Sequence, residues 1–130
     1  MAEQPGRAIV YVYRHVPTPF SFGGYPGIYV NGEWKFDLKD KGYGVITLPP
    51  GQHEIKAEGS AGWWVLAPVT RTIAAEAGRE YYVRIRRVIL PNLETGQGSR
   101  IAEMIQIPKD EALKELSKNR LVTETDDTGR

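Results

Sequence analysis

The sequence predicts a mainly β protein: an antiparallel β-sandwich of the immunoglobulin-like or transthyretin-like kind, with one short C-terminal helix. Three observations indicate this fold class. The 130 residues include 14 glycines and 9 prolines, which divide the chain into short segments, as turns do in all-β proteins. Asn31-Gly32 joins two segments of strand-forming residues. Residues 53–58 carry a charged residue at every second position, which is typical of a strand with one buried face. A small barrel is the alternative architecture.

In the N-terminal half, residues 8–15 are expected to form a strand in the middle of a sheet. This segment is rich in β-branched and aromatic residues and offers apolar side chains to both faces as far as Arg14. A loop over residues 16–26 should follow. The clearest hairpin joins residues 28–30 to 33–36, because Asn-Gly suits a type I′ turn, in which both central residues need positive φ.

In the C-terminal half, residues 69–75 are expected at a sheet edge, because Arg71 shares a face with Val69 and Ile73. The segment 81–90 should form a strand that follows a turn at Gly78. Further strands are expected at residues 43–48, 53–58, 63–66 and 100–107, with turns or loops at 49–52, 59–62 and 92–99.

One stretch, which starts at Pro108, favours a helix. Proline suits a first helical position, and the acidic residues of Lys109–Lys118 come early whereas its later lysines lie toward the end. The chain length suits one domain. We therefore expect a disordered N-terminus over residues 1–6, a single β-sandwich domain over 7–118, and a mostly flexible polar tail over 119–130.

Composition narrows the classes of function. The formal net charge of +1 gives no overall attraction to nucleic acid or to an anionic membrane surface, so a nucleic-acid partner is disfavoured. The absence of cysteine excludes disulfides, thiol nucleophiles and cysteine-ligated zinc. No apolar run approaches the roughly 20 residues that span a bilayer. We expect no cofactor.

The sequence shows no recognisable catalytic or metal-binding motif, so we predict that the protein is not an enzyme. The two histidines, His15 and His53, fall at expected strand ends and do not form a zinc-binding pair. None of the serines lies in a Gly-x-Ser-x-Gly elbow. The alternative, a hydrolase with dispersed residues, requires one of these histidines within hydrogen-bond reach of a serine or carboxylate.

Candidate ligand-binding residues are arginines and aromatics. On the strand 81–90, Tyr81, Val83 and Ile85 should face the core, which leaves the alternate residues on the other face. Arginine beside an aromatic can bind a phosphate, a carboxylate or a stacked base. The competing interpretation is a solvated face whose arginines pair with glutamates of a neighbouring strand. The candidates on this basis are Arg14, Tyr82, Arg84 and Arg86.

Trp63-Trp64 adds a further candidate. Adjacent strand residues point to opposite faces, so one tryptophan can lie in the core while the other is exposed. We take Trp64 as a candidate interface residue. Burial beneath the loop that carries Phe20 and Phe22 is the alternative.

Three segments resemble a known family: AIVYVYR at residues 8–14, LPPGQHEI at 48–55 and AGREYYVR at 77–84. Together with the Asn31-Gly32 hairpin, they look like the bacterial domain of unknown function 2846, over roughly residues 6–116. The resemblance implies a small envelope protein, often a predicted lipoprotein, and implies no established activity. The chain has neither a signal peptide nor a lipid-accepting cysteine. Either a native precursor supplies the lipid anchor and the protein is periplasmic or envelope-anchored, or the protein is cytoplasmic.

Our leading hypothesis is a non-catalytic β-sandwich module that binds or scaffolds a protein partner or small ligand at the bacterial envelope. The first alternative is binding of an anionic ligand or nucleic acid through the arginine and tyrosine strand face. Pairing of Arg84 and Arg86 with glutamates would argue against it. The second alternative is the dispersed hydrolase.

Overall fold

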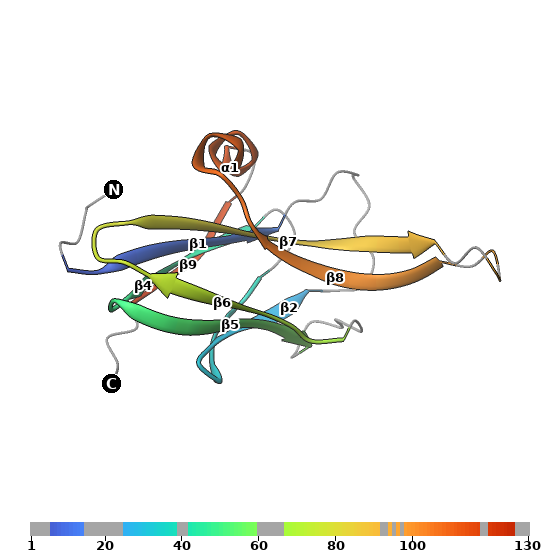
Figure 1. The fold of residues 1–130 in the computed structure, drawn as a ribbon, viewed down its shortest axis with the longest axis horizontal. Coiled ribbons are helices and arrows are strands. Elements are labelled where there is room, and N and C mark those ends of the chain that lie inside the picture. The colour runs from blue at the N-terminus through green and yellow to red at the C-terminus, as the bar shows by residue number, and fades with distance from the viewer. Residues whose placement is uncertain are drawn as a thin grey trace.

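Two β-sheets packed face to face, with a helix on the outside of one of them, make up the protein in a computed structural model (Figure 1). The structure describes residues 6–14, 25–38, 42–59, 67–91, 94, 96, 98–117 and 120–126. The elements are β1 (Ala8–Arg14), β2 (Pro26–Val30), β3 (Glu33–Asp37), β4 (Gly42–Leu48), β5 (Gly51–Gly59), β6 (Val69–Ala75), β7 (Glu80–Pro91), β8 (Gly98–Gln106), α1 (Lys109–Leu116) and β9 (Arg120–Asp126). The predicted β-sandwich with one C-terminal helix is confirmed.

The larger sheet has five strands in the order β8-β7-β1-β4-β9, and the smaller has four in the order β3-β2-β5-β6. Strand β1 is the central strand of the larger sheet, as its uninterrupted apolar sequence predicts, and all of its residues are buried. It pairs antiparallel with β4 but parallel with β7, and β4 pairs parallel with β9. The sandwich is therefore mainly antiparallel, with two parallel pairs in the larger sheet.

The predicted hairpin joins β2 to β3. Asn31 has φ 52° and Gly32 has φ 85°, the positive values that a type I′ turn requires. Tyr29 pairs with Trp34, whereas Ile28 pairs with Phe36, so β3 contains a bulge with one extra residue.

Strands β5 and β6 also follow their sequence pattern. His53, Ile55 and Ala57 are buried on one face of β5, while residues between them are more exposed. β6 lies at the edge of its sheet, as Arg71 on its apolar face predicts.

Apolar residues from both sheets fill the space between them. Gly44 of β4 lies directly against the ring of Phe36 of β3, and a Cβ atom at this position would overlap that ring. Glycine is therefore required here by the close approach of the two layers. The inner core consists of Ala8, Val10, Val12, Ile28, Val30, Phe36, Leu38, Ile46, Leu48, Ile55, Ala57, Ile73, Ala75, Val83, Ile85 and Met104.

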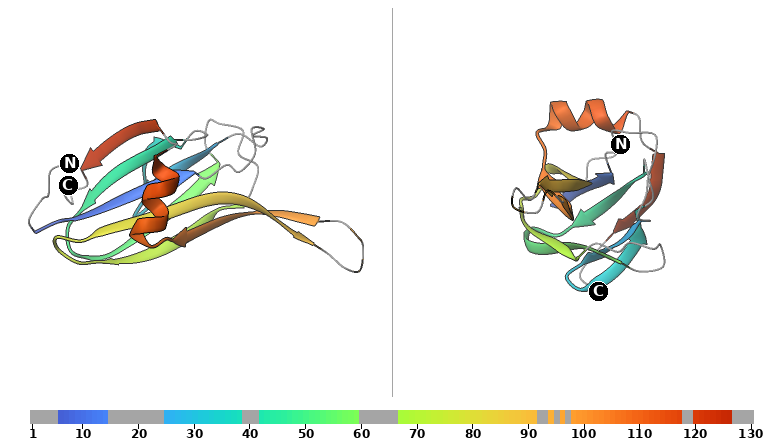
Figure 2. Two further views of the ribbon diagram at one scale, coloured as in Figure 1. Left: turned by 90° about the horizontal axis from the view of Figure 1, so that it is seen from above. Right: turned by 90° about the vertical axis from the view of Figure 1, so that its right-hand side faces the viewer.

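A second apolar cluster lies on the opposite face of the larger sheet, beneath α1. The helix runs across the strands there (Figure 2). Its Ala112 is fully buried, whereas Leu113 is 48% exposed. The helix therefore has a small apolar contact area, and other forces must help to hold it.

The C-terminal segment differs from the sequence-based expectation. Residues 119–130 were expected to form a mostly flexible polar tail, but residues 120–126 form β9. The polar sequence suggested a flexible tail, but an edge strand needs no run of apolar residues. Main-chain hydrogen bonds to β4 are enough to hold β9 in the sheet.

Strands β7 and β8 extend past the sandwich as a two-stranded ribbon (Figure 1). β1 pairs with β7 as far as Ile85, and among the described residues the rest of β7 pairs with β8 alone. The expected strand over residues 63–66, the loop over 16–24 and the first five residues lie outside the described residues.

Candidate functional site

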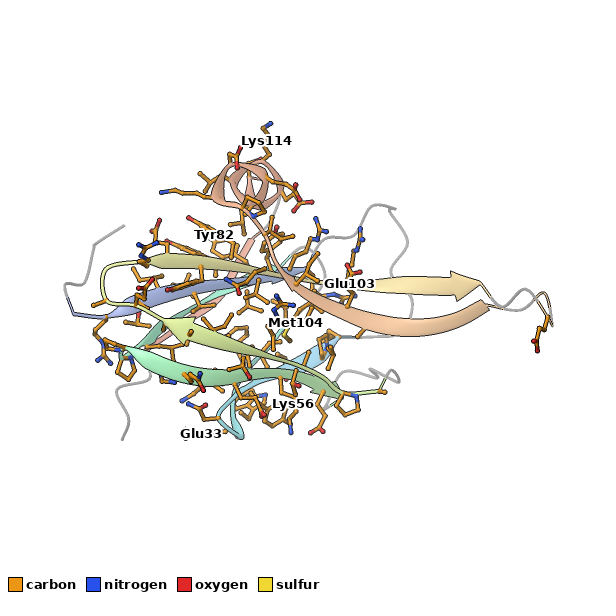
Figure 3. All side chains as sticks on the ribbon, viewed as in Figure 1. Glu33, Lys56, Tyr82, Glu103, Met104 and Lys114 are labelled. Carbon is orange, nitrogen blue, oxygen red and sulfur yellow. The ribbon has the colours of Figure 1, made fainter. Side chains whose placement is uncertain are left out.

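A groove of about 440 Å³ lies between α1 and the outer face of the larger sheet, and we call it the tyrosine groove. Strands β1, β4 and β7 form its floor and α1 forms one wall. Figure 3 shows Tyr82 on the side of the sheet that faces the helix. The lining residues are Tyr11, Tyr43, Glu80, Tyr82, Lys109, Leu113, Leu116 and Ser117.

Strand alternation and parallel pairing bring the tyrosines together. Tyr11 of β1 is the register partner of Tyr82 of β7, so both side chains leave the sheet on the same face. Their rings stack with centroids 4.9 Å apart and an interplanar angle of 7°. Aromatic pairs of this kind add to the free energy of burial and fix both rings in place.

The carboxylate of Glu80 binds the hydroxyl groups of both tyrosines. It accepts hydrogen bonds from the hydroxyls of Tyr11 at 3.3 Å and Tyr82 at 3.2 Å. The ammonium of Lys109, at the start of α1, donates to it at 3.1 Å. Burial raises the pKa of Glu80, but hydrogen bonds and charge from Lys109, together with the two phenols, outweigh this and leave the pKa below its usual value.

The pKa values of the tyrosine phenols are shifted in the opposite direction, upward. Burial, followed by the negative charge of Glu80, raises the pKa of Tyr82 to about 12. The same causes raise the pKa of Tyr11 still further. Burial and the hydrogen bond to Glu115 hold the pKa of Tyr13 far above its usual value. At neutral pH all three phenols are therefore protonated donors.

An ion-pair network around the buried Arg84, next to the groove, holds α1 on the sheet. Arg84 of β7 is 8% exposed, and its Nη1 lies 3.2 Å from Glu111 Oε2 and 3.1 Å from Glu115 Oε2. Tyr13 donates a hydrogen bond of 2.5 Å to Glu115 Oε1. Glu111 and Glu115 are one helical turn apart and so share a face of α1. These charge-assisted contacts compensate for the small apolar area beneath the helix.

The structure brings together only some of the residues that the sequence indicated. Tyr82 lies in the groove and Arg84 beside it, while Arg86 pairs with Glu103 of β8 at 2.6 Å. Arg14 shares the face of Val12, toward the inner core, and is 3% exposed. Trp64 lies outside the described residues. Arg84 and Arg86 thus each pair with glutamate, the arrangement that argues against an anion site at these two residues.

His53 has a structural role. Its Nδ1 accepts a hydrogen bond of 3.0 Å from Asn31 Nδ2, and its Nε2 donates to the Pro49 carbonyl at 2.8 Å. Both ring nitrogens are thereby used to fix the hairpin turn and the start of β5, and no serine or carboxylate bonds to the ring among the contacts of the described residues. His15 lies outside those residues.

The described part of the chain contains neither a cluster of metal ligands nor a membrane-spanning helix. No three residues of histidine, cysteine, aspartate or glutamate there are grouped so that they could hold a metal ion. Within that part, the one helix is too short to cross a bilayer.

Sequence reasoning missed most of the groove. Glu80 could have been found, because it alternates with Tyr82 and Arg84 and must share their face. Tyr11 and Lys109 could not be linked to it, because nothing in the local sequence indicates that β1 pairs parallel with β7 or that α1 covers this face.

Comparison with known proteins identifies the family. The family model described as "Protein of unknown function (DUF2846)" matches residues 4–98, which include Tyr11, Glu80 and Tyr82 but end before α1. The search of curated proteins gave no match, and neither did the search of solved structures. Because the family match spans more than half of the chain, this protein belongs to the DUF2846 family.

Proposed function

We propose that this protein is a non-catalytic binding module and that the tyrosine groove is its ligand site. The observation that carries the proposal is the direction of the pKa shifts in the groove. A general acid, base or nucleophile works best with a pKa near the operating pH. Here the phenols of Tyr11 and Tyr82 are shifted upward and the carboxyl of Glu80 downward, so all three are fixed in one protonation state at neutral pH. Such groups can recognise a ligand but are poorly suited to proton transfer.

The groove favours an uncharged ligand with a ring and several hydroxyl groups, such as a sugar. Glu80 and Lys109 neutralise each other, so the site has no net charge to select an ion. Leu113 and Leu116 on the helix, together with the tyrosine rings, offer apolar walls. Tyr11 and Tyr82 donate their own protons to Glu80 and keep oxygen lone pairs that can accept from ligand hydroxyls. A volume of about 440 Å³ falls within the range of small-molecule sites.

The test is a titration of the ¹⁵N-labelled full chain with glucose, N-acetylglucosamine and maltose, followed by NMR. We expect the largest shift changes at Tyr82, Glu80 and Lys109, and we expect the sugar to be recovered unchanged. Tyr82→Phe keeps the ring but loses the acceptor, so the affinity should fall by about fivefold, equivalent to one hydrogen bond.

Tyr81→Phe is the matched control, since Tyr81 lies on the same strand but its hydroxyl binds the main chain at Ala74 and Glu76, away from the groove. Shift changes outside the groove, or equal affinities for the two phenylalanine variants, would contradict the proposed site. Conversion of the sugar would contradict a non-catalytic role.

We further propose that this binding takes place at the bacterial envelope, an expectation that the family resemblance supports. Fractionation of cells that express the native gene tests the location. A periplasmic or membrane-bound product supports the envelope, whereas a cytoplasmic product contradicts it and leaves the groove proposal unaffected.

A further inference from the structure

The outer face of the smaller sheet carries a second, open arrangement of aromatic and charged side chains. Strand register places Trp34, Tyr29, Lys56 and Thr70 in one row across β3, β2, β5 and β6. Trp34 is 51% exposed. Figure 3 shows Lys56 and Glu33 on the side of the molecule away from Tyr82 and α1. This row and the acidic residues around it are here called the Trp34 face, and it is separate from the tyrosine groove.

The two aromatic side chains of the Trp34 face are held in place. The indole nitrogen of Trp34 donates a hydrogen bond of 3.1 Å to Asp37 Oδ1. The ammonium of Lys56 lies 5.1 Å from the centroid of the Tyr29 ring. This face therefore already holds one cation against an aromatic ring, while the larger ring of Trp34 is half exposed to solvent. Tryptophan is the aromatic side chain that attracts cations best.

The charges around the aromatic pair are mostly negative. Lys35 pairs with Glu33 at 3.3 Å, and Lys56 lies 3.7 Å from Glu58. Two further carboxylates, those of Asp37 and Glu54, give the described residues of this face an excess of negative charge. Negative charge repels nucleic acid and anionic membrane surfaces, so the complementary partner is cationic.

We propose that the Trp34 face binds a protein segment that presents arginine or lysine side chains, with one of these cations stacked on the Trp34 ring. Tryptophan and tyrosine supply most of the binding energy at many protein interfaces. The flanking carboxylates of Asp37, Glu33 and Glu54 orient the cation and select against neutral and anionic segments.

The test uses the ¹⁵N-labelled full chain and a peptide of sequence Gly-Arg-Gly-Arg-Gly with blocked ends. The comparison peptide carries citrulline, which is uncharged and similar in shape, in place of arginine. We expect the arginine peptide to shift the indole N–H signal of Trp34 and the amide signals of Tyr29 and Lys56, and the citrulline peptide to bind much more weakly. Rising salt should weaken binding of the arginine peptide.

Variants separate the aromatic contribution from the general charge of the protein. Trp34→Ala should weaken binding of the arginine peptide about two- to fivefold, as expected for an exposed cation–π contact. Glu54→Gln on the face should weaken it about twofold, whereas Glu76→Gln removes one carboxylate from a distant turn and should leave it unchanged.

Three results of the peptide titrations would overturn the proposal. These are equal binding of the citrulline and arginine peptides, shift changes away from the Trp34 face, and an unchanged affinity in Trp34→Ala. Self-association of the chain through this face without peptide would equally overturn it, by showing that the occupant is a second copy. None of these outcomes measures the binding of a sugar to the tyrosine groove, so the proposed function is tested separately.

Discussion

The outer faces of the two sheets both carry aromatic and charged side chains, but a helix covers one face and leaves the other open to solvent. On the larger sheet, α1 covers Tyr13, Tyr82 and Arg84, which are 0%, 4% and 8% exposed. On the smaller sheet no described element covers Trp34, which is 51% exposed. Aromatic and charged side chains on an outward strand face therefore have no fixed meaning by themselves, because the element that packs on them decides whether they act as internal structure or as surface.

The ion pairs on the covered and open faces should differ in how much they contribute to stability. Arg84 is withdrawn from water and must be matched by Glu115 and Glu111, because an unpaired buried charge is strongly unfavourable. Lys35 and Glu33 pair on the open face; the Lys35 side chain is 12% exposed, but that of Glu33 is 68% exposed, so solvent screens the attraction from the glutamate side. We expect the first network to determine stability and the second to contribute little to it.

Alkaline pH should have the largest effect on the covered face. In the unfolded chain a tyrosine ionises near pH 10, but in the folded protein the pKa of Tyr82 is about 12 and those of Tyr11 and Tyr13 are higher. The folded state then binds more protons, so stability is complete below pH 10 and falls as the pH rises through 12. Tyr82 alone accounts for roughly 3 kcal/mol of this loss. Urea unfolding between pH 9 and 12 measures it.

Tyr82→Phe provides the control for the alkaline loss, because it removes one late-ionising phenol and should make the fall between pH 10 and 12 shallower. If wild type and variant lose stability in parallel, the phenol of Tyr82 ionises normally and the cover provided by α1 is looser than described.

Removal of Arg84 should have the next largest effect. Arg84→Met removes the buried cation that faces Glu115, whose side chain is only 16% exposed, so we expect a loss of about 3 kcal/mol in the free energy of unfolding. The matched variant is Arg86→Met on the same strand. The Arg86–Glu103 pair has side chains 36% and 29% exposed, so its loss should cost only about 1 kcal/mol. Urea denaturation of both variants at pH 7 checks the difference.

A substitution on the open face of the smaller sheet should cause the smallest loss of stability. Trp34→Ala should change the free energy of unfolding by no more than about 0.5 kcal/mol, as is usual for exposed positions. A loss at Trp34 that matches the loss at Arg84 would break the comparison, because it would mean that the smaller sheet depends on its outer face as much as the larger one does.

The sequence predicted the local features of the fold well. The Asn31-Gly32 turn, the buried alternate residues of β5 and the edge position of β6 each follow from short-range patterns, and the structure confirms them. The central position of β1 also followed from its own residues, because only a strand covered on both faces can bury every side chain.

The candidate site was harder to predict because it depends on contacts between distant segments. The groove needs Tyr11 beside Tyr82, a parallel pair whose partners are far apart in the chain, and it needs α1 to cross above them. Short-range sequence patterns predict neither the pairing of β1 with β7 nor the position of α1. The strand β9 was missed for a related reason, since its pairing with β4 relies on main-chain hydrogen bonds that any residue except proline can make.

The central place of β1 also has a consequence for how the chain reaches its native state. Of the described strands β1 is made first, but Ile9 can pair with β7 only after Glu80 has been made, and β4 gains its second neighbour only with β9, which ends at Asp126. The five-stranded sheet therefore cannot assemble in the order of synthesis. Distant pairings of this kind delay folding to the range of milliseconds to seconds. During that interval β1 can pair with β4, but its other edge lacks β7, and this exposed edge of an apolar strand is the place where chaperones would have to prevent aggregation.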